Sequence, residues 1–321
     1  MVKKMNEQKI NIRKAISSQL FLDDDLLISF IRTAPYRYKT YEISKRNSEE
    51  KRQIAHPSKE LKAIQRIIIK ELDNKLPVHE KAFAYKENIS IKENALAHVN
   101  STFLLKMDIS SFFNSISPDI FWGKIEALQV NLSDNDKEIL TKCLFYKKKN
   151  NPGLCLSVGA PSSPIISNFI MFNFDKKVSS LCKRYKVIYT RYADDMTFST
   201  NKKGILLDFP KKIARALKKE FGEALKINNE KTVFSSKAHN RHVTGITLSN
   251  QNELSLGRER KRSISAKIHH FQNGKLGKEE LNNLRGMLAF CKHIEPSFIK
   301  RMEGKYTKEI IEEIMKYRID L

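Results

Sequence analysis

Two adjacent acids, Asp194 and Asp195, stand between two runs of β-forming residues, 187–192 and 196–200, and this pattern predicts a hairpin. Two carboxylates at a tight turn repel each other, and a divalent cation removes that repulsion. Magnesium prefers oxygen ligands and usually takes one or two protein carboxylates, which leaves coordination positions for water and substrate phosphate. Aspartate is also common in polar surface turns, so the pair alone leaves both a metal site and a plain turn open.

A third acid, Asp108, lies near the end of an apolar run, residues 102–109, that is typical of a buried strand. If the fold brings the ends of these strands together, three carboxylates could hold two magnesium ions about 3.5–4 Å apart. One ion would activate a 3′-hydroxyl group, and the other would stabilise the leaving pyrophosphate. The three acids therefore predict nucleotidyl transfer.

The rest of the chain must supply the elements that position these acids. The expected helices span residues 24–32, 58–72, 118–128, 133–145, 163–183 and 209–221, and the expected strands span 36–43, 102–109, 187–192, 196–200, 231–234 and 242–248. Ser58 and Ser133 are the expected helix N-caps, with Asp136 as the acid of a capping box. After Gly257 the pattern is wholly helical. We expect an N-terminal helical segment over 1–35, a mixed α+β region over 36–250 and a helical module over 251–321.

The composition favours a nucleic-acid partner. Lysine and arginine number 59 against 36 aspartate and glutamate, which gives a net charge of +23. A surplus of this size repels itself across a compact fold, so we expect a polyanion to neutralise it. The basic residues are spread along the whole chain instead of forming one basic amphipathic helix, which favours nucleic acid over a membrane surface. Hydrophobic residues make up 40% of the chain, which excludes wholesale disorder.

The sequence predicts a cytoplasmic protein without a membrane partner. No apolar run is long enough to span a bilayer, and no hydrophobic stretch follows the basic N-terminal residues as in a secretion signal. The four cysteines form no CxxC pair, so neither a zinc site nor a disulfide framework is indicated. Reduced thiols are the expectation.

Four motifs, in the right order, resemble those of reverse transcriptases. YADD over residues 192–195 resembles the YxDD box, and LKMDISSFF over 105–113 resembles the first catalytic box. GAPSSP over 159–164, followed by Ser167 and Asn168, resembles the box between them, and PSKELKAIQ over 57–65 resembles the upstream fingers motif. NALAH over 94–98 and VTG over 243–245 resemble two elements that mark bacterial retron reverse transcriptases. Group II intron and diversity-generating reverse transcriptases share the catalytic boxes but not this pair.

This resemblance implies a right-hand polymerase fold. Fingers would span about 36–100, the palm would reach about 250 with an antiparallel sheet that carries the acids, and a small helical thumb would follow. Asp108, Asp194 and Asp195 would be catalytic, and with Ile109 they would hold two magnesium ions. The implied nucleotide-binding residues are Phe113, Lys51, Arg52, Gly159, Ala160 and Lys231, and the implied RNA-binding residues are Asn94, His98, Val243, Thr244 and Gly245.

The nucleotide-binding residues have specific expected roles. Phe113 would select deoxynucleotides by clashing with a 2′-hydroxyl group while Phe112 lies in the core, although both rings could be core residues. Lys51 and Arg52 would hold the triphosphate or form a solvated basic turn. Gly159 and Ala160 would let the backbone approach a base pair closely.

Other positions leave alternatives open. Lys231 would act as a general acid near the leaving group or be an ordinary surface lysine. His98 would contact RNA or be a capping or core histidine. Val158 stands where retron enzymes usually carry glutamine, so a glutamine contact to nucleotide or template is absent.

The start of the helical module is strongly basic. Ile264 and Ile268 mark an apolar stripe that we expect to dock on the palm while the cations face outward. Such a charge run is often only a solvated face, but its low acid content favours contact with an RNA backbone. The expected RNA-binding cations are Arg258, Arg260, Lys261, Arg262 and Lys267.

The resemblance also implies a biological setting. The enzyme would make DNA from deoxynucleoside triphosphates on a structured noncoding RNA of the msr-msd type, primed from an internal 2′-hydroxyl group of that RNA. The product would be branched RNA–DNA (msDNA), and a separate effector protein would join the system in anti-phage defence. A non-catalytic RNA-binding scaffold that masks an effector is the alternative from another class, and the three intact acids argue against it.

Overall fold

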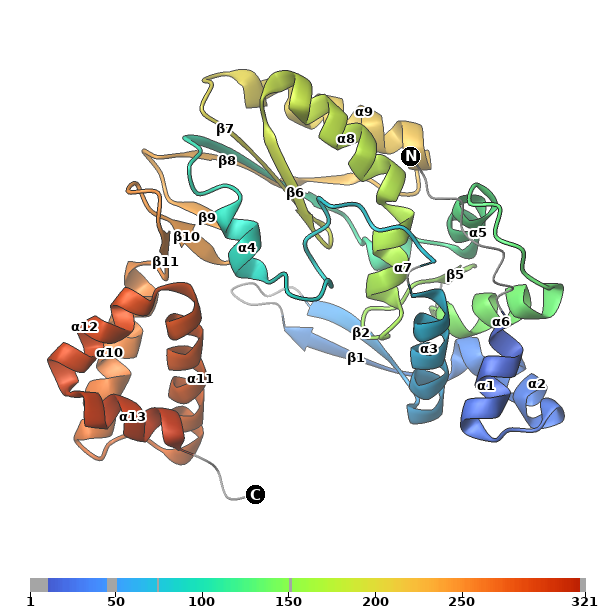
Figure 1. The fold of residues 1–321 in the computed structure, drawn as a ribbon, viewed down its shortest axis with the longest axis horizontal. Helices are drawn as coiled ribbons and strands as arrows, with labels where there is room; N and C mark the ends of the chain where they lie inside the picture. Colours follow the sequence, from blue (N-terminus) through green and yellow to red (C-terminus); the bar gives the residue numbers. More distant parts are fainter. Residues whose placement is uncertain (1–10, 45–50, 74, 150–151, 318–321) are drawn as a thin grey trace. The chain divides into compact units, whose positions relative to one another are not determined.

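The computed structural model describes residues 11–44, 51–73, 75–149 and 152–317 (Figure 1). By their contacts the residues form two compact units that alternate along the sequence. The first unit comprises Met1–Tyr85, Lys106–Met196 and Leu207–Thr232, and the second comprises Lys86–Leu105, Thr197–Leu206 and Val233–Leu321. The segment limits expected from the sequence are functional assignments, and they stay a prediction.

A four-stranded sheet positions the acids. Its strand order is β6 (Ile188–Tyr192), β7 (Asp195–Thr200), β3 (Phe103–Ile109) and β8 (Ile227–Ser236). The predicted hairpin is confirmed, because β6 and β7 are adjacent both in the sheet and in the chain. β3 is buried along most of its length beside β7, as its apolar run predicts. β8 is largely exposed at one edge and extends beyond the predicted 231–234.

The first unit contains most of the remaining elements. Its helices are α1 (Ile12–Leu20), α2 (Asp24–Thr33), α3 (Lys59–Leu72), α5 (Pro118–Glu126), α6 (Asp134–Leu144), α7 (Ser163–Ile170), α8 (Phe172–Tyr185) and α9 (Phe209–Phe221). Two small antiparallel pairs complete it: β1 (Tyr38–Ser44) with β2 (Lys51–Pro57), and β4 (Tyr146–Lys147) with β5 (Leu154–Cys155). α8 contacts both β6 and α9, and Figure 1 shows α8 and α9 side by side along the sheet.

Local signals set most helix ends. The Ser58 Oγ accepts the Leu61 N–H at 3.3 Å, so this predicted N-cap is confirmed. Ser133 also caps as predicted, but an Oδ1 of Asp136 accepts the N–H of Arg13 at 3.0 Å and so ties α1 to α6. The helical character predicted over 163–183 is confirmed, with one break: Met171, with φ −77° and ψ −4°, leaves the α-helical range and separates α7 from α8.

The second unit contains helices α4 (Ile91–Leu96), α10 (Arg258–Gln272), α11 (Lys278–Ile294), α12 (Pro296–Tyr306) and α13 (Lys308–Lys316), with short strands β9 (Arg241–Val243), β10 (Ile246–Leu248) and β11 (Leu254–Ser255). The single strand predicted over 242–248 is wrong. Thr244 and Gly245, with φ 46° and 79°, form a two-residue turn between β9 and β10. Two positive φ angles are typical of the tight turn that joins hairpin strands.

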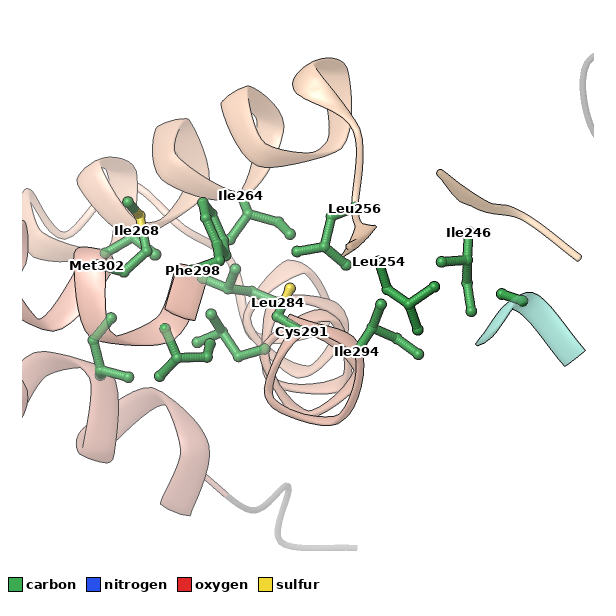
Figure 2. Close-up of a cluster of buried hydrophobic side chains, with 14 of the residues drawn as sticks. Ile246, Leu254, Leu256, Ile264, Ile268, Leu284, Cys291, Ile294, Phe298 and Met302 are labelled. Atoms are coloured by element: carbon green, nitrogen blue, oxygen red, sulfur yellow. The ribbon is translucent and has the colours of Figure 1, made fainter. Parts of the chain in front are cut away.

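One hydrophobic cluster holds this second unit together (Figure 2). Ile264 and Ile268 of α10 are fully buried there, against Leu284 of α11 and Phe298 of α12. The same cluster contains Leu104, Val243, Ile246 and Leu248, which lie in the segment expected to form the palm, so the inward direction expected for these isoleucines agrees with the structure.

In the described ranges no helix is long and apolar enough to cross a membrane. The four cysteines are buried free thiols.

Candidate active site

The structure brings the three acids together in the first unit. Asp108 lies in β3, Asp194 lies in the turn after β6, and Asp195 begins β7. The N–H of Ile109 donates to the main-chain carbonyl of Asp194 over 3.2 Å, which ties the end of β3 to the turn. The strand order places β3 directly beside β7, so Asp108 and Asp195 lie on neighbouring strands.

Negative charge accumulates at this turn. Desolvation and the nearby charge of Asp108 raise the pKa of Asp194 above its ordinary value. The side chain of Asp195 is open to solvent, yet desolvation by the surrounding protein and the charges of Asp194 and Asp108 raise its pKa to about 6. The neighbouring carboxylates therefore make ionisation of Asp194 and Asp195 more costly.

Lys231 offsets part of this charge. Its Nζ on β8 lies 3.3 Å from Oδ1 and 3.2 Å from Oδ2 of Asp108, and the side chain stays half-exposed. The expectation of an ordinary surface lysine is therefore wrong. Lys231 contacts one of the three acids directly.

The carboxylates of the three acids suit metal ions that bind together with the substrate. In the described part of the chain, no three His, Cys, Asp or Glu side chains form a ready-made metal cage. Magnesium is commonly bound through one or two carboxylates plus substrate phosphates, so converging acids with raised pKa values suit it without such a cage. The side chain of Ile109 is fully buried, so only its main-chain carbonyl is available as a ligand.

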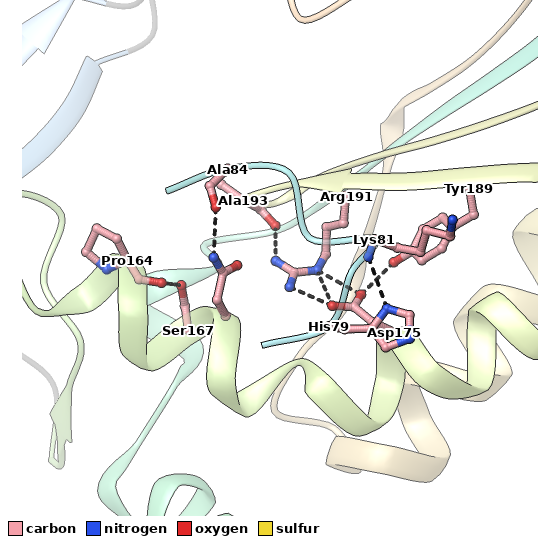
Figure 3. A network of polar contacts seen from close by, with 10 residues as sticks. His79, Lys81, Ala84, Pro164, Ser167, Asp175, Tyr189, Arg191 and Ala193 are labelled. Atoms are coloured by element: carbon pink, nitrogen blue, oxygen red, sulfur yellow. Dashed lines mark hydrogen bonds and ion pairs between the residues drawn. The ribbon is translucent and has the colours of Figure 1, made fainter. Parts of the chain in front are cut away.

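A buried ion pair holds the turn in place (Figure 3). Arg191 and Asp175 have no exposed side-chain surface, and the guanidinium donates from Nε to Oδ1 at 2.9 Å and from Nη2 to Oδ2 at 2.7 Å. The hydroxyl of Tyr189 donates to the same Oδ1 at 2.7 Å. Burial alone would lower the pKa of Arg191, but the charge of Asp175 raises it above its ordinary value. Arg191 is therefore charged and fixed.

The same guanidinium reaches the catalytic turn itself. Its Nη1 donates to the carbonyl of Ala193 at 2.9 Å, as Figure 3 shows. Ala193 has φ 57°, a left-handed conformation that costs a residue with a side chain about 1–2 kcal/mol. The bond to Arg191 helps to hold this strained residue, and the residue sets the direction of Asp194 and Asp195.

A strap over residues 79–85 crosses the outer side of β6. The N–H of Phe83 donates to the carbonyl of Arg191, and the N–H of Arg191 donates to the carbonyl of Lys81, both at 2.7 Å. The Nδ2 of Asn168 on α7 donates to the carbonyl of Ala84 at 2.9 Å. Asn168, which follows the GAPSSP motif, therefore holds the strap in place.

Sequence reasoning missed Arg191, Asp175 and Tyr85. Tyr85 ends the strap with φ 62° and leaves its ring 48% exposed. Desolvation and the charge of Asp194 raise the pKa of Tyr85, so its ring lies within electrostatic reach of the acids. The sequence does contain a signal for Arg191, because a charged residue inside a run of β-forming residues predicts a buried partner of opposite charge.

The two fingers cations differ in their surroundings. Lys51 pairs with Glu42 across the β1–β2 hairpin at 3.1 Å, and both side chains are exposed. The charge of Arg52 opposes the rise in pKa that burial gives Asp194. The charge of Arg52 therefore acts on Asp194, whereas Lys51 is paired with Glu42.

The GAPSSP segment joins β2. The N–H of Ala55 donates to the carbonyl of Val158 at 2.9 Å. Gly159 has φ 125°, and a Cβ there would lie 3.1 Å from the carbonyl oxygen of Ala55, so glycine is required. Ala160 is buried, and the close backbone approach expected at Gly159 and Ala160 stays a prediction.

Phe112 and Phe113 differ in burial, as expected. Phe112 is buried in the core, which confirms its prediction, and Phe113 is partly exposed at the start of a short 3₁₀ helix (Phe113–Ser115). The ring centroids lie 5.4 Å apart.

The side chains of three expected RNA-binding residues are buried in the second unit, and their contact with RNA stays a prediction: Asn94, His98 and Val243. The Nδ1 of His98 lies 2.7 Å from the Ser199 Oγ, and burial lowers the pKa of His98 to about 3, so the ring is neutral. The Nδ2 of Asn94 donates to the Thr244 Oγ1 at 3.5 Å. Within this element, Asn94 therefore contacts the β9–β10 turn, where Thr244 is half-buried and Gly245 is exposed, whereas His98 contacts β7.

The basic helix α10 is only partly outward-facing. Arg258 and Arg262 are exposed. The Nζ of Lys261 lies 2.7 Å from a carboxylate oxygen of Glu295, so the expected outward direction is wrong for Lys261. Arg260 lies over the Phe290 ring at 5.4 Å, and Lys267 donates to Asn283 at 3.3 Å.

Asp195→Asn should stabilise the metal-free protein above about pH 6. The folded pKa of Asp195 lies above its unfolded value, so the wild type loses stability as pH rises from about 4 to about 6, and the variant does not. Solvent screens this exposed group, so we expect the free energy of unfolding of the variant to exceed that of the wild type by about 1 kcal/mol at pH 7.5. Below about pH 4 we expect no difference between the two proteins. Thermal unfolding in EDTA at both pH values measures this, and a pH-independent difference would contradict it.

Arg191→Met should cost about 3–5 kcal/mol of unfolding free energy, because it leaves the Asp175 carboxylate buried without its partner. The double variant Arg191→Met/Asp175→Leu removes both charges and should recover much of that loss. Urea unfolding of the two variants gives the comparison. If the double variant is as unstable as the single one, the uncompensated charge is not the cause.

Comparisons with known proteins agree with this geometry. A model of the family described as reverse transcriptase (RNA-dependent DNA polymerase) matches residues 43–248. Retron Ec83 reverse transcriptase of Escherichia coli is 47% identical over 282 residues, which cover 87% of this chain and 90% of the relative. Retron Ec86 reverse transcriptase of the same organism is 33% identical over 290 residues, with 87% and 85% covered. Retron Ec73 reverse transcriptase, also from Escherichia coli, is 31% identical over 315 residues, with 94% and 96% covered.

These matches extend over nearly the whole chain and include the segments that carry the three acids. The protein has the right-hand polymerase fold and RNA-directed DNA polymerase activity. It belongs to the retron reverse transcriptase family.

Proposed function

We propose that this retron reverse transcriptase adds deoxynucleotides at Asp108, Asp194 and Asp195, using a structured noncoding RNA as template. The observation that supports the proposal most strongly is the convergence of these acids at the β6–β7 turn, with pKa values raised at Asp194 and Asp195. A protein with no use for bound cations gains nothing from this repulsion. The scaffold alternative leaves the acids unexplained, and the matched relatives disfavour an intron or diversity-generating enzyme.

Reverse transcriptases use divalent metal ions. Here we propose two magnesium ions, held by the three acids and the carbonyl of Ile109, which would activate the 3′-hydroxyl group and stabilise the leaving pyrophosphate. Arg191 would keep the turn aimed at these ions through Ala193. Lys231 would exchange its contact with Asp108 for the phosphates of the nucleotide and could then protonate the leaving group.

The nucleotide would lie between the fingers hairpin and the acids. Arg52 would hold the triphosphate, and Lys51 would add charge at the hairpin surface. Gly159 would allow close backbone approach, and the partly exposed Phe113 would exclude a 2′-hydroxyl group.

The RNA partner would be of the msr-msd type and would supply an internal 2′-hydroxyl group as primer, giving branched RNA–DNA. Thr244 and Gly245 at the exposed turn, with Arg258 and Arg262 on α10, would contact it. We place the protein in the bacterial cytoplasm, in anti-phage defence with a separate effector protein.

Asp195→Asn should lower deoxynucleotide incorporation at least about 10²-fold while RNA binding stays nearly unchanged, because one metal ligand is lost and the basic surface remains. The assay combines the purified protein with its co-purifying RNA, magnesium and labelled deoxynucleotides. Asp25→Asn, which neutralises an exposed acid on α2, is the matched control. Wild-type rates in the Asp195 variant would refute the catalytic assignment.

Phe113→Val should admit ribonucleotides, because removing the ring opens space for a 2′-hydroxyl group. The readout is the ratio of kcat/KM for dCTP to kcat/KM for CTP, which should fall by about 10-fold or more, equivalent to about 1.4 kcal/mol. Phe113→Tyr keeps the ring and should keep the ratio. If the valine variant discriminates as well as the wild type, Phe113 does not select the sugar.

A further inference from the structure

Helices α8 and α9 form one antiparallel layer in the first unit. The rings of Phe174 and Phe221 lie 6.4 Å apart, and those of Tyr185 and Phe209 lie 5.8 Å apart, so the start of each helix meets the end of the other. The buried apolar side chains of α8 face the sheet, since α8 contacts β6. The opposite faces of both helices are left to solvent (Figure 1).

These outer faces are basic. α8 carries four Lys or Arg residues and α9 carries five, against one acid on each helix. The exposed cations recur at helical spacing, so each set shares one face: Lys176, Lys183 and Arg184 on α8, and Lys211, Arg215 and Lys219 on α9. We call these six residues the outer basic face.

Both acids of the two helices turn away from this face. Asp175 is fully buried with Arg191. The Glu220 side chain is 6% exposed and pairs with Lys124 and Lys177. Within the described residues, none of the six cations of the outer basic face forms an ion pair with an acid. Like charges four residues apart destabilise a helix, so this pattern does not serve the stability of the fold.

We propose that the outer basic face is a second RNA-binding surface, which takes the phosphate backbone of a double-stranded stem in the RNA partner. This inference rests on the proposed function for the existence of that partner. The outer basic face lies on the side of α8 opposite to its buried apolar residues, which pack toward β6, so the stem would be held away from the sheet that carries the acids.

The shape and chemistry of the face favour duplex RNA. Each row of cations spans about 12 Å, and packed helices lie about 8–10 Å apart, which gives two fixed rows of charge for a rigid backbone. Single strands are usually bound by stacking on aromatic rings. On these two fully described helices, the exposed ring is Tyr185, which packs edge-on against Phe209 with Lys212 above it. A protein interface is usually depleted in lysine and has an apolar centre, which this face lacks.

The test is the salt dependence of binding to a hairpin RNA with a stem of about 16 base pairs. The triple variant Lys211→Gln/Arg215→Gln/Lys219→Gln should flatten the log–log salt slope by about 2 units, at about 0.7–0.9 per phosphate contact. Glutamine is a good helix former, and circular dichroism checks that α9 persists. The control triple is Lys137→Gln/Lys308→Gln/Lys316→Gln, which removes the same charge from lysines paired with acids and should leave the slope unchanged.

An unchanged slope in the α9 variant, or an equal change in the control, would overturn the proposal, and an acidic protein surface would then be the class of partner to seek. An equal flattening with a single-stranded RNA of the same length would overturn the assignment to duplex RNA. Binding needs no catalysis. Failure of the wild type to make DNA would therefore count against the proposed function and leave this measurement intact.

Discussion

Arg191 and Asp175 meet without solvent exposure between β6 and α8, and the guanidinium also donates to the carbonyl of Ala193. Burying two charges costs several kcal/mol, and well-packed apolar residues often replace such pairs without loss of stability. We interpret this ion pair as the interaction that fixes the orientation of the turn. It anchors the strained turn to a long helix, so that Asp194 and Asp195 keep one orientation beside Asp108 although their charges repel one another.

The basic side chains of this protein occupy three different environments. Arg191 is buried and supports the turn. Lys231 and Arg52 act on the acids themselves, where they offset part of the negative charge, and in the proposed function they would also bind phosphates. The outer basic face has no acid partners among the described residues and suits a polyanion. The net charge of +23 is thus divided among separate tasks, and the negative centre lies inside a strongly basic chain.

The sequence was sufficient to predict the local elements and the meeting of the acids. The two runs of β-forming residues around Asp194 and Asp195 gave the hairpin, and the apolar run before Asp108 gave a buried strand, which the structure places beside β7. Tertiary contacts decided the rest. Motif identity could not show that Asn94 and His98 face inward, because burial depends on the β9–β10 turn and on Ser199. Asp175 on α8 gave no local sign that it would pair with Arg191, and the directions of the α10 cations depend on Glu295 and Phe290 from later helices.

The central claim is that Asp108, Asp194 and Asp195 form one divalent-metal site. Iron(II) in place of magnesium, with ascorbate and peroxide, cleaves the backbone next to where it binds and so maps the site directly. If the three acids share one site, cleavage falls near residues 108–109 and 193–195, is competed by magnesium and is lost in Asp108→Asn. Cleavage at other positions only, or cleavage at these positions that persists in Asp108→Asn, would contradict it.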